Sequence, residues 1–443
     1  MSHHGTVSVS AGGLTRAAVE GVSARLGEPA WAIERRLAAW EAFERLPLPS
    51  VTYPEAWRRT DISALDLAGL VLPEGGPGPS RAQSFGPITR DSRERAGLLT
   101  HLDGAPGAAE LSDAARQQGV VFSDLTAAMR EHPELVRDHL LTTAARPDEH
   151  RFRALHAALW SGGTFVYVPK GVEVTLPLVT QIWLGIPGGA VFPHTLLIAD
   201  ERSKVTLVEL STSVPSGPRT LASGVVELVL RAGSQVRYAA VQEWGPPMWE
   251  VGSLTRAHLD RDASLASLVV SLGAGLVKVD VESQLRGPGA TSEMLGLYFG
   301  TGTQHIDFHT LQEHRAPHTT SDLLYRGAVK DTARAVFAGL IRVDPGAQKT
   351  NAFQANRNLI LSEGARSDSI PKLEILANDL RCTHGSATSR LNEEHIFYLM
   401  SRGLSRRQAT FMIVEGFFAD VFDRIPIDRL RTYLQARIAE KMT

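Results

Sequence analysis

The chain reads KVTLVEL from Lys204 to Leu210, GVVELVL from Gly224 to Leu230 and QVRYAAV from Gln235 to Val241. These runs are short and rich in β-branched residues. Their apolar and polar positions alternate, as expected of strands with one buried face. Two more runs of this kind are TFVYV at Thr164–Val168 and LASLVVSL at Leu265–Leu272. The middle of the chain is therefore predicted to consist of β-strands.

A turn of small residues recurs just before several of these strands. It reads ERS at Glu201–Ser203, AGS at Ala232–Ser234, DAS at Asp262–Ser264 and GA at Gly289–Ala290, at intervals of about 30 residues. Short strands at regular spacing predict a β-solenoid or a β-sandwich. The length of the region and its lack of long helical patterns favour the solenoid, a β-helix.

Helical patterns flank this region on both sides and suggest three domains. Residues 1–150 are predicted to form a mostly helical N-terminal domain, residues 151–390 the β-helix core, and residues 391–443 a C-terminal helical domain. In the first domain, apolar residues recur at helical spacing from Ile33 to Phe43. Further helices are expected near 113–118 and 123–141, and the Pro- and Gly-rich stretch 73–80 is interpreted as a linker.

The C-terminal domain carries clear helix boundaries. Asn392 is a predicted N-cap and Gly403 a predicted helix end, and Ser405 with Gln408 forms a capping box for the next helix. A last helix is expected over 428–441. Two helices joined at a glycine resemble a DNA-binding helix-turn-helix, but 8 basic residues against 7 acidic ones give no phosphate-binding surface. A docking surface for a protein partner is predicted instead.

Composition excludes several classes of protein. The 443 residues include 46 basic and 48 acidic ones, which argues against a general binder of nucleic acid or of anionic membranes. A single cysteine excludes an internal disulfide framework and suits a reducing compartment. The first residues, MSHHGTVSVSAGG, lack the apolar segment of a signal peptide, and no apolar run is long enough for a transmembrane helix. We therefore expect a cytoplasmic protein.

Cys382 and His384 are the first candidate site. They lie in KLEILANDLRCTHGSATSRLNEEHIFYLMSR, from Lys372 to Arg402, where a strand-like run ends. Residues two apart on a strand point the same way, and thiolate and imidazole are good ligands for soft or borderline metals and iron–sulfur species. One thiol and one imidazole cannot close a cluster site, so the other ligands must come from another chain or the cluster is only partly held. The alternative is that Cys382 is a small buried hydrophobe.

A second candidate site is a run of four histidines at 305, 309, 314 and 318. They predict either a metal site or polar ladders between the coils of a solenoid. The polar run 348–358, QKTNAFQANRN, is predicted to form side-chain hydrogen bonds along the coils. No Walker A, GxGxxG, HExxH or GxSxG motif is present. If ATP drives the work of this protein, another chain must hydrolyse it.

Three separated segments resemble one known family. They are FRALHAALWSGGTFVYVPKGVEVTLP (Phe152–Pro177), HTTSDLLYRGAVKDTARAVFAG (His318–Gly339) and CTHGSATSRLNEEHIFYLMSRGL (Cys382–Leu404). In this order they resemble the SufB/SufD family of iron–sulfur cluster assembly proteins. The N-terminal stretches LPLP at 46–49 and EAWRRTD at 55–61, like the chain length, look more like SufD than SufB.

The resemblance implies a mostly β protein, with a right-handed parallel β-helix flanked by helical N-terminal and C-terminal domains. It implies a non-catalytic scaffold subunit of a SufBCD-type complex, paired with a SufB-like protein through the β-helices and with the SufC-like ABC ATPase through the C-terminal helices. The family's Cys-x-His motif falls on Cys382 and His384, which are predicted to be metal ligands for a nascent cluster at the SufB interface. We expect no stably bound cofactor on the chain alone, and a transient iron–sulfur cluster or iron in the complex.

Two other functions are alternatives to this one. A SufB-like homodimeric cluster scaffold would use a second copy of the chain as its partner. A polysaccharide-active β-helix enzyme would need clustered carboxylates on one face of the solenoid, aromatic platforms and usually secretion. Since the aromatic residues lie mostly at core positions and no signal peptide is seen, the enzyme is the remoter alternative.

Overall fold

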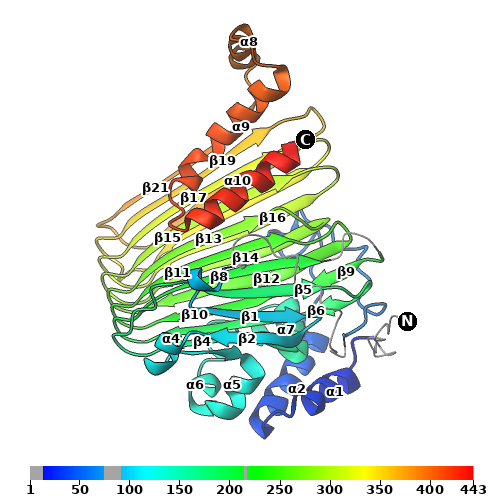
Figure 1. Ribbon diagram of the computed structural model, residues 1–443, viewed down its shortest axis with the longest axis vertical. Coiled ribbons are helices and arrows are strands. Elements are labelled where there is room, and N and C mark those ends of the chain that lie inside the picture. The colour runs from blue at the N-terminus through cyan, green and yellow to red at the C-terminus, as the bar shows by residue number, and fades with distance from the viewer. Residues whose placement is uncertain (1–12, 74–90, 214–216, 443) are drawn as a thin grey trace.

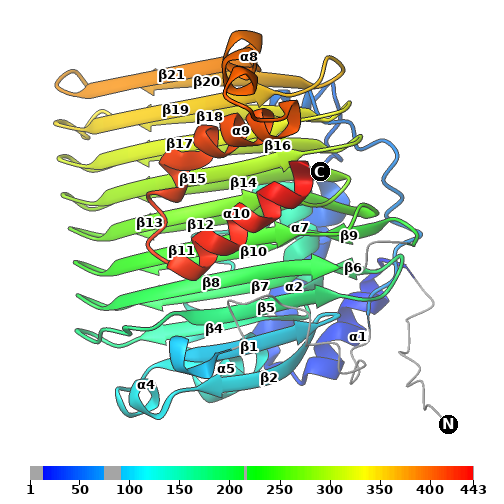
Figure 2. The same ribbon diagram turned by 45° about the horizontal axis from the view of Figure 1, so that its top comes forward.

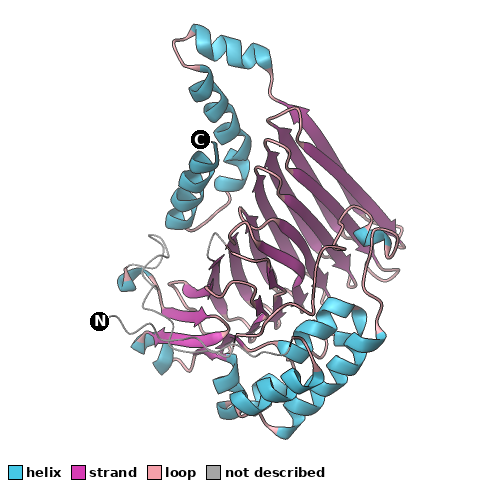
Figure 3. Cartoon of the chain, turned by 90° about the vertical axis from the view of Figure 1, so that its right-hand side faces the viewer, coloured by secondary structure: helices cyan, strands magenta, loops and turns pink. Residues whose placement is uncertain are grey.

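The core of the computed structural model, which describes residues 13–73, 91–213 and 217–442, is a β-solenoid made of two facing sheets (Figures 1 and 2). Ten strands form one sheet and eleven form the other. Helices lie at both ends of the chain (Figure 3). The predicted mostly β fold, a solenoid flanked by helices, is confirmed, and the sandwich alternative is wrong. The linker predicted at 73–80 lies outside the described residues from position 74 onward.

Each coil adds one strand to each sheet. The ten-stranded sheet runs in the order β2 (Ala105–Leu111), β1 (Gly97–Leu102), β5 (Leu178–Leu184), β8 (Lys204–Ser213), β11 (Gln235–Glu243), β13 (Ser264–Ser271), β15 (Thr291–Gly300), β17 (Thr320–Val329), β19 (Asn351–Ile360) and β21 (Arg381–Arg390). The main path of the other sheet is β20 (Arg366–Ile375), β18 (Arg334–Val343), β16 (His305–His314), β14 (Leu276–Leu285), β12 (Met248–Leu259), β10 (Val225–Leu230), β7 (Pro193–Ala199), β4 (Gly162–Val168) and β3 (Val121–Asp124), with β6 (Ala190–Val191) and β9 (Thr220–Ala222) beside it. The β1–β2 and β3–β4 pairs are antiparallel, and the solenoid pairs are parallel.

The recurring small-residue turn is one corner of the solenoid. The backbone has positive φ at Arg202, Gly233, Asp262 and Gly289, which are the second or first residues of the turns noted in the sequence. At each corner the backbone bonds to the next coil, for example from Arg202 N to the Ala232 carbonyl at 3.0 Å. The residue after each of these positions is small and fully buried, because only a short side chain fits inside the corner.

Two tyrosines and two glycines interlock inside the solenoid. Gly296 pairs with Tyr325 on the adjacent strand, and Tyr298 pairs with Gly327. A Cβ placed on Gly296 would lie 2.2 Å from the Tyr325 ring, and one on Gly327 would lie 1.8 Å from the Tyr298 ring. Each ring therefore occupies space that the facing glycine leaves open. Both tyrosines are fully buried, so the rings cannot move away into solvent.

The Gly327→Ala substitution is expected to destabilise the chain by about 1–3 kcal/mol, because the added methyl group overpacks the Tyr298 ring. Chemical denaturation followed by circular dichroism measures this. The matched control is Gly346→Ala, where no atom lies within 4 Å of the new Cβ. The interlock would be contradicted if both variants unfolded at the wild-type denaturant concentration.

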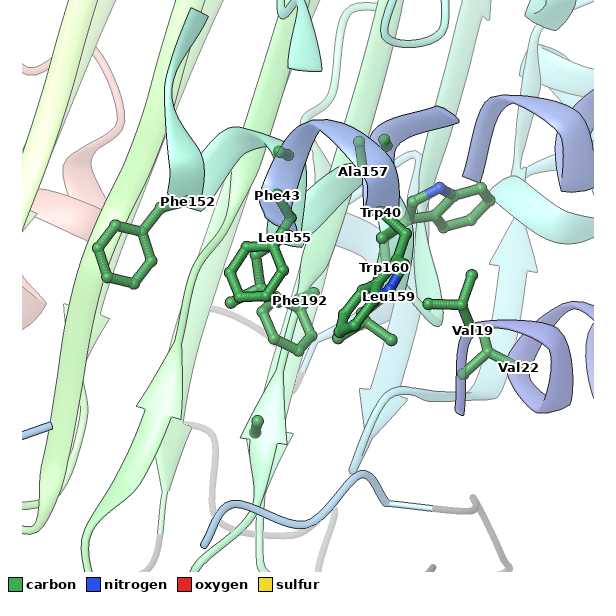
Figure 4. Packing of buried hydrophobic residues seen from close by; sticks show 14 of the residues in the cluster. Val19, Val22, Trp40, Phe43, Phe152, Leu155, Ala157, Leu159, Trp160 and Phe192 are labelled. Carbon is green, nitrogen blue, oxygen red and sulfur yellow. The ribbon is translucent and has the colours of Figure 1, made fainter. Parts of the chain in front are cut away.

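The N-terminal helices pack on the flank of the first coils. These helices are α1 (Arg16–Leu26), α2 (Ala30–Arg45), α5 (Leu125–Glu131), α6 (Pro133–Arg137) and α7 (Arg151–Leu159), with a short α4 (Asp113–Gln117) and 3-10 turns η1 (Glu55–Trp57), η3 (Ser92–Glu94) and η4 (Pro147–Glu149). Trp40, Phe43 and Trp160 pack with Phe192 of the solenoid in one buried cluster (Figure 4). The solenoid and this helical layer therefore share one hydrophobic core.

Two features of the N-terminal 150 residues differ from the sequence predictions. Strands β1, β2 and β3 lie within 97–124 and extend the solenoid sheets, although this region was predicted to be mostly helical. The helix predicted over 123–141 is divided into α5 and α6. Pro133 starts α6, because proline lacks the N–H that a continuous helix would need there.

A buried chain of polar groups ties the helical layer to the solenoid. His156 Nδ1 lies 2.7 Å from the Ser223 carbonyl, and His156 Nε2 lies 2.9 Å from His194 Nδ1. His194 Nε2 then lies 3.1 Å from Glu227 Oε1. Glu227 also accepts hydrogen bonds from the backbone N–H groups of Leu141 and Ala145. All three side chains are buried.

The hydrogen-bond partners of the two histidines indicate where the protons lie. If His156 Nδ1–H donates to Ser223, its Nε2 accepts from His194 Nδ1–H, and the other nitrogen of His194 is an acceptor. His194 Nε2 then faces Glu227 Oε1 as one acceptor facing another, without hydrogen-bond geometry, and protonation of Glu227 removes the repulsion between them. Burial raises the pKa of Glu227 to about 8 and lowers that of His194 to about 3, which matches this fully neutral arrangement.

The pH dependence of stability should report this proton. Because the pKa of Glu227 is raised in the folded state to about 8, the folded chain binds one more proton than the unfolded chain between the ordinary glutamate pKa and pH 8. This contribution to the free energy of unfolding should fall by up to about 1.4 kcal/mol per pH unit in that window and level off above pH 8. Urea titrations of wild type and Glu227→Gln isolate it by difference. An identical pH slope in both proteins would show that Glu227 is ionised.

Candidate functional site

Cys382 and His384 lie on β21, in the last coil of the solenoid. β21 and β20 are the outermost strands of the two sheets at this end, and no other strand in the described ranges pairs with their outer edges. Cys382 pairs in register with Ala352, and His384 with Gln354. Since Ala352 and Gln354 are both buried, the register places the two predicted ligands on the inward-facing side of the open coil.

The two candidates differ in their surroundings. Cys382 is half-buried and packs against a small cluster that includes Ile341 and Ala352. Burial raises the pKa of its thiol, so the thiolate that binds metals is disfavoured on the isolated chain. His384 is exposed. The position of Cys382 is compatible with both a packing role and metal ligation. The imidazole of His384 is accessible without rearrangement.

Gln354, directly beneath His384, was not singled out as a site residue by the sequence. It is fully buried, and neither atom of its amide group has a hydrogen-bond partner among the described residues. Its amide occupies the space that Gly339 leaves by lacking a Cβ. The amide of Gln354, which has no hydrogen-bond partner, therefore provides a buried polar group directly beneath the exposed imidazole of His384.

The neighbouring polar residues form the side-chain network that the run 348–358 predicts. Asn358 Nδ2 donates to Asn356 Oδ1 at 2.7 Å, and Asn356 Nδ2 lies 3.3 Å from the Tyr298 hydroxyl. The Tyr298 hydroxyl in turn donates to Asn358 Oδ1 at 2.5 Å. All three are buried between the sheets, so they stabilise the last coils and line no cleft.

The four clustered histidines do not converge. His305 bonds to Thr60, His309 lies 3.2 Å from Asp307, His314 bonds to two hydroxyl groups, and His318 sits at a corner with positive φ. The part of the chain that the structure describes holds no group of three or more His, Cys, Asp or Glu side chains that could bind a metal ion. His305, His309 and His314 thus make polar contacts, but these contacts are not ladders between equivalent positions of neighbouring coils.

The C-terminal helices cover one flank of the solenoid and then extend past its end (Figure 3). They are α8 (Glu393–Ser401), α9 (Arg406–Phe422) and α10 (Asp428–Met442), and the predicted caps at Asn392 and Ser405 are confirmed. Val414 and Phe418 of α9 and Leu434 of α10 are buried against outward-facing residues of the ten-stranded sheet. Most of the apolar surface of α9 and α10 is therefore already covered by this chain.

Polar contacts fasten the same helices to the sheet. Arg326 of β17 bonds to the Phe417 carbonyl and to Asp420 of α9. Glu243 of β11 pairs with Arg437 of α10. Helix α8 differs, because its large side chains are exposed: Phe397 is 73% exposed and Tyr398 is 56% exposed. Free apolar surface in this domain therefore lies chiefly on α8.

Two models of known protein families match the solenoid and the helices that flank it. The family model "SUF system FeS cluster assembly, SufBD core domain" matches residues 184–417, and "SufBD protein N-terminal region" matches residues 105–180. The chain belongs to the SufB/SufD family of iron–sulfur cluster assembly proteins. The core match spans the solenoid from the end of β5 to β21 and continues into α9, so it includes the open coil and the exposed α8.

Curated relatives from both branches of the family are similar over nearly the whole chain. The iron–sulfur cluster assembly protein SufD of Bacillus subtilis is 30% identical, covering 94% of this chain and 95% of its own length. SufB of the same organism is 28% identical, covering 94% and 90%. A SufBD family protein of Staphylococcus epidermidis has the same figures as SufB. Within the described residues, the structure has no helix with the length and apolar character needed to span a membrane.

Proposed function

We propose that this chain is a SufD-like, non-catalytic, cytoplasmic scaffold subunit that pairs through its open coil with a SufB-like protein. The uncovered end of the solenoid carries this proposal. Leu373 and Ile375 of β20 and the following Leu376 are large apolar residues with substantial exposure at this end. Exposed strand edges beside apolar side chains are unfavourable in water and are usually covered by a partner.

The partner proposed is another member of the same family. A second solenoid can extend both sheets at once, since its terminal strands would offer backbone groups in matching positions. A SufB-like protein is favoured over a second copy of this chain, because one half-buried thiol and one imidazole supply too few ligands for a cluster. In this arrangement His384 and Cys382 contribute to a nascent cluster whose remaining ligands belong to SufB, and the cluster is cargo.

One observation supports the SufB-like homodimeric scaffold as a second candidate. SufB and SufD of Bacillus subtilis are nearly equally similar to this chain, at 28% and 30% identity. The two functions differ in what the isolated chain does. A homodimeric scaffold would assemble stoichiometric iron and sulfide without another protein, whereas a SufD-like subunit would not.

Helix α8 is the proposed docking site for the SufC-like ABC ATPase. Phe397, Tyr398 and Met400 are exposed on a helix that extends beyond the solenoid, and Phe397 is the most exposed large apolar residue in the described ranges. The sequence predicts partner docking on the C-terminal helical domain as a whole, but the apolar side of α9 and α10 is largely buried on the sheet. Deleting the segment would expose the sheet face, so point substitutions on α8 test the proposal more cleanly.

The first test concerns His384. His384→Ala removes an exposed imidazole, so the variant should fold and co-purify with its SufB-like and SufC-like partners. Cluster content of the anaerobically purified complex should fall on the order of tenfold, as expected when a ligand-site residue is lost. Cys382→Ala should have a smaller effect, because the thiol is already part of a packed cluster.

The matched control is Ser386→Ala, the next residue on the same side of β21. It should leave iron and sulfide content unchanged. Wild-type cluster content in His384→Ala would reduce this residue to a structural role, and loss of the partners would show that it acts through packing.

The second test concerns Phe397. Phe397→Ser removes an exposed aromatic anchor and should weaken capture of the SufC-like ATPase by about 30-fold, as for a central residue of an interface. Isothermal titration with the purified ATPase measures this. Leu176→Ser, at a leucine that is 40% exposed just before β5, toward the opposite end of the solenoid, should bind as wild type does. Equal affinities for both variants would place the docking site elsewhere.

A further inference from the structure

A cavity opens on the N-terminal helical layer, beside α2. Its volume is about 300 Å³, and its walls come from α2, from the segment 140–148 and from the end of α7. This is the lower end of the range for small-molecule sites, which occupy roughly 300–1,000 Å³. The helical layer packs on the first coils, so the cavity is remote from the open coil and from α8 (Figure 1).

The inner wall of this cavity is apolar. Ala39, Leu140 and Trp160 line it and are at most 2% exposed, so the cavity reaches the buried core of the helical layer. Three further alanines of α2 line it as well, and their short side chains leave space that larger residues would fill: Ala32, Ala38 and Ala42. Water gains few hydrogen bonds against such a wall, so an apolar molecule is favoured there.

Arg36 lines the cavity without adding net charge to it. Its guanidinium group is buried and stacks on the Trp160 ring, 4.4 Å from the ring centre. Its Nε and Nη2 donate to the two carboxylate oxygens of Glu28 at 2.7 and 2.6 Å. Because this pair is bidentate and buried, the charge of Arg36 is already neutralised by Glu28.

Arg35 differs, because in the described ranges no carboxylate is bonded to its guanidinium group. Its Nη1 donates to the carbonyl oxygens of Arg137 at 2.8 Å and Leu140 at 3.1 Å. Asp138 and Glu227 attract it only from a distance. The group that lines the cavity is therefore held in position by neutral oxygens and keeps its positive charge.

Arg45 adds a second positive charge at the rim. It lines the cavity and is exposed at the end of α2. The lining includes one acidic residue, Asp148, whose two oxygens already accept from Arg146 Nε at 3.1 Å and Nη2 at 2.6 Å. Arg45 attracts this carboxylate by charge, without a hydrogen bond. An apolar wall is thus combined with two cations that have no bonded carboxylate among the described residues.

We propose that this cavity binds a small aromatic anion, with a planar apolar body and one acidic group of the carboxylate or sulfonate type. The body packs against Ala39 and Trp160, and the acidic group faces Arg35 and Arg45, since arginine binds such groups through charge-assisted hydrogen bonds. The Arg35 guanidinium lies 4.7 Å from the centre of the Trp31 ring, so a planar apolar face and a positive charge are adjacent. This favours an aromatic body over an aliphatic chain. The site shares no residue with the open coil or α8, so it is independent of the function proposed above.

Titration of the full chain with anilinonaphthalene sulfonate, a fluorescent aromatic anion, tests the proposal. We expect one saturable site per chain with blue-shifted emission, because the apolar wall excludes water from the bound probe. Ala38→Phe, at an exposed alanine of the lining, should weaken binding by about tenfold or more by filling the cavity. The matched control is Ala24→Phe, at an exposed alanine of α1 outside the lining, which should bind as wild type does.

A second comparison isolates the contribution of charge. Arg45→Gln should weaken binding of the anion by about fivefold, as expected when one charge-assisted hydrogen bond is lost. It should leave unchanged the binding of phenylnaphthylamine, which has the same ring system without the sulfonate. Arg116→Gln, at an exposed arginine of α4 outside the lining, is the control and should alter neither affinity.

Three results would overturn the proposal. The first is the absence of saturable binding of the anion to the wild-type chain, which depends on no variant. The second is binding that survives Ala38→Phe, because the anion would then occupy another surface. The third is equal weakening of both ligands by Arg45→Gln, since the arginine would then act through packing and the ligand need not be an anion.

Discussion

The parallel backbone ladder between successive coils is the constraint on which the rest of this structure depends. Register on one coil sets register on the next, so a side chain's neighbours above and below are decided by the corners at Arg202, Gly233 and Asp262. The tyrosine–glycine interlock and the asparagine network follow from that alignment. The same ladder has no successor beyond β20 and β21 in the described chain, and the candidate ligands lie on that last rung.

The ladder also explains why the two ends of the solenoid differ. At the first coils, α2 and α7 cover the flank with a core centred on Trp40 and Trp160, and β1 and β2 turn antiparallel at the edge (Figure 4). At the last coil the edges stay open, and α8 projects beyond them with its aromatic side chains exposed. One end of the described chain is therefore covered by its own helices and strands, while the strand edges at the other end are left uncovered.

Local signals in the sequence predicted most of the helices and strands. They could not predict which distant segments contact each other. Alternation located β8, β11 and β13, and the capping residues Asn392 and Ser405 located α8 and α9, because these features depend on a few neighbouring residues. The Cys-x-His motif drew attention to β21 in the same way. Strands β1 to β3 were missed because they are short and lie among helical patterns. The position of Gln354 beneath His384 depends on which residues face each other between coils, and such facing cannot be read from spacing alone.

The repeating corner limits how such a chain can change its length in evolution. An insertion or deletion of one complete coil, about 30 residues, leaves every strand above it in register, and the new coil inherits the same inward and outward faces. The insertion or deletion of a single residue inside a strand instead reverses the inward and outward faces of all positions up to the next corner. Solenoids of this kind are therefore expected to grow and shrink by whole coils, with single-residue variation confined to the corners and loops.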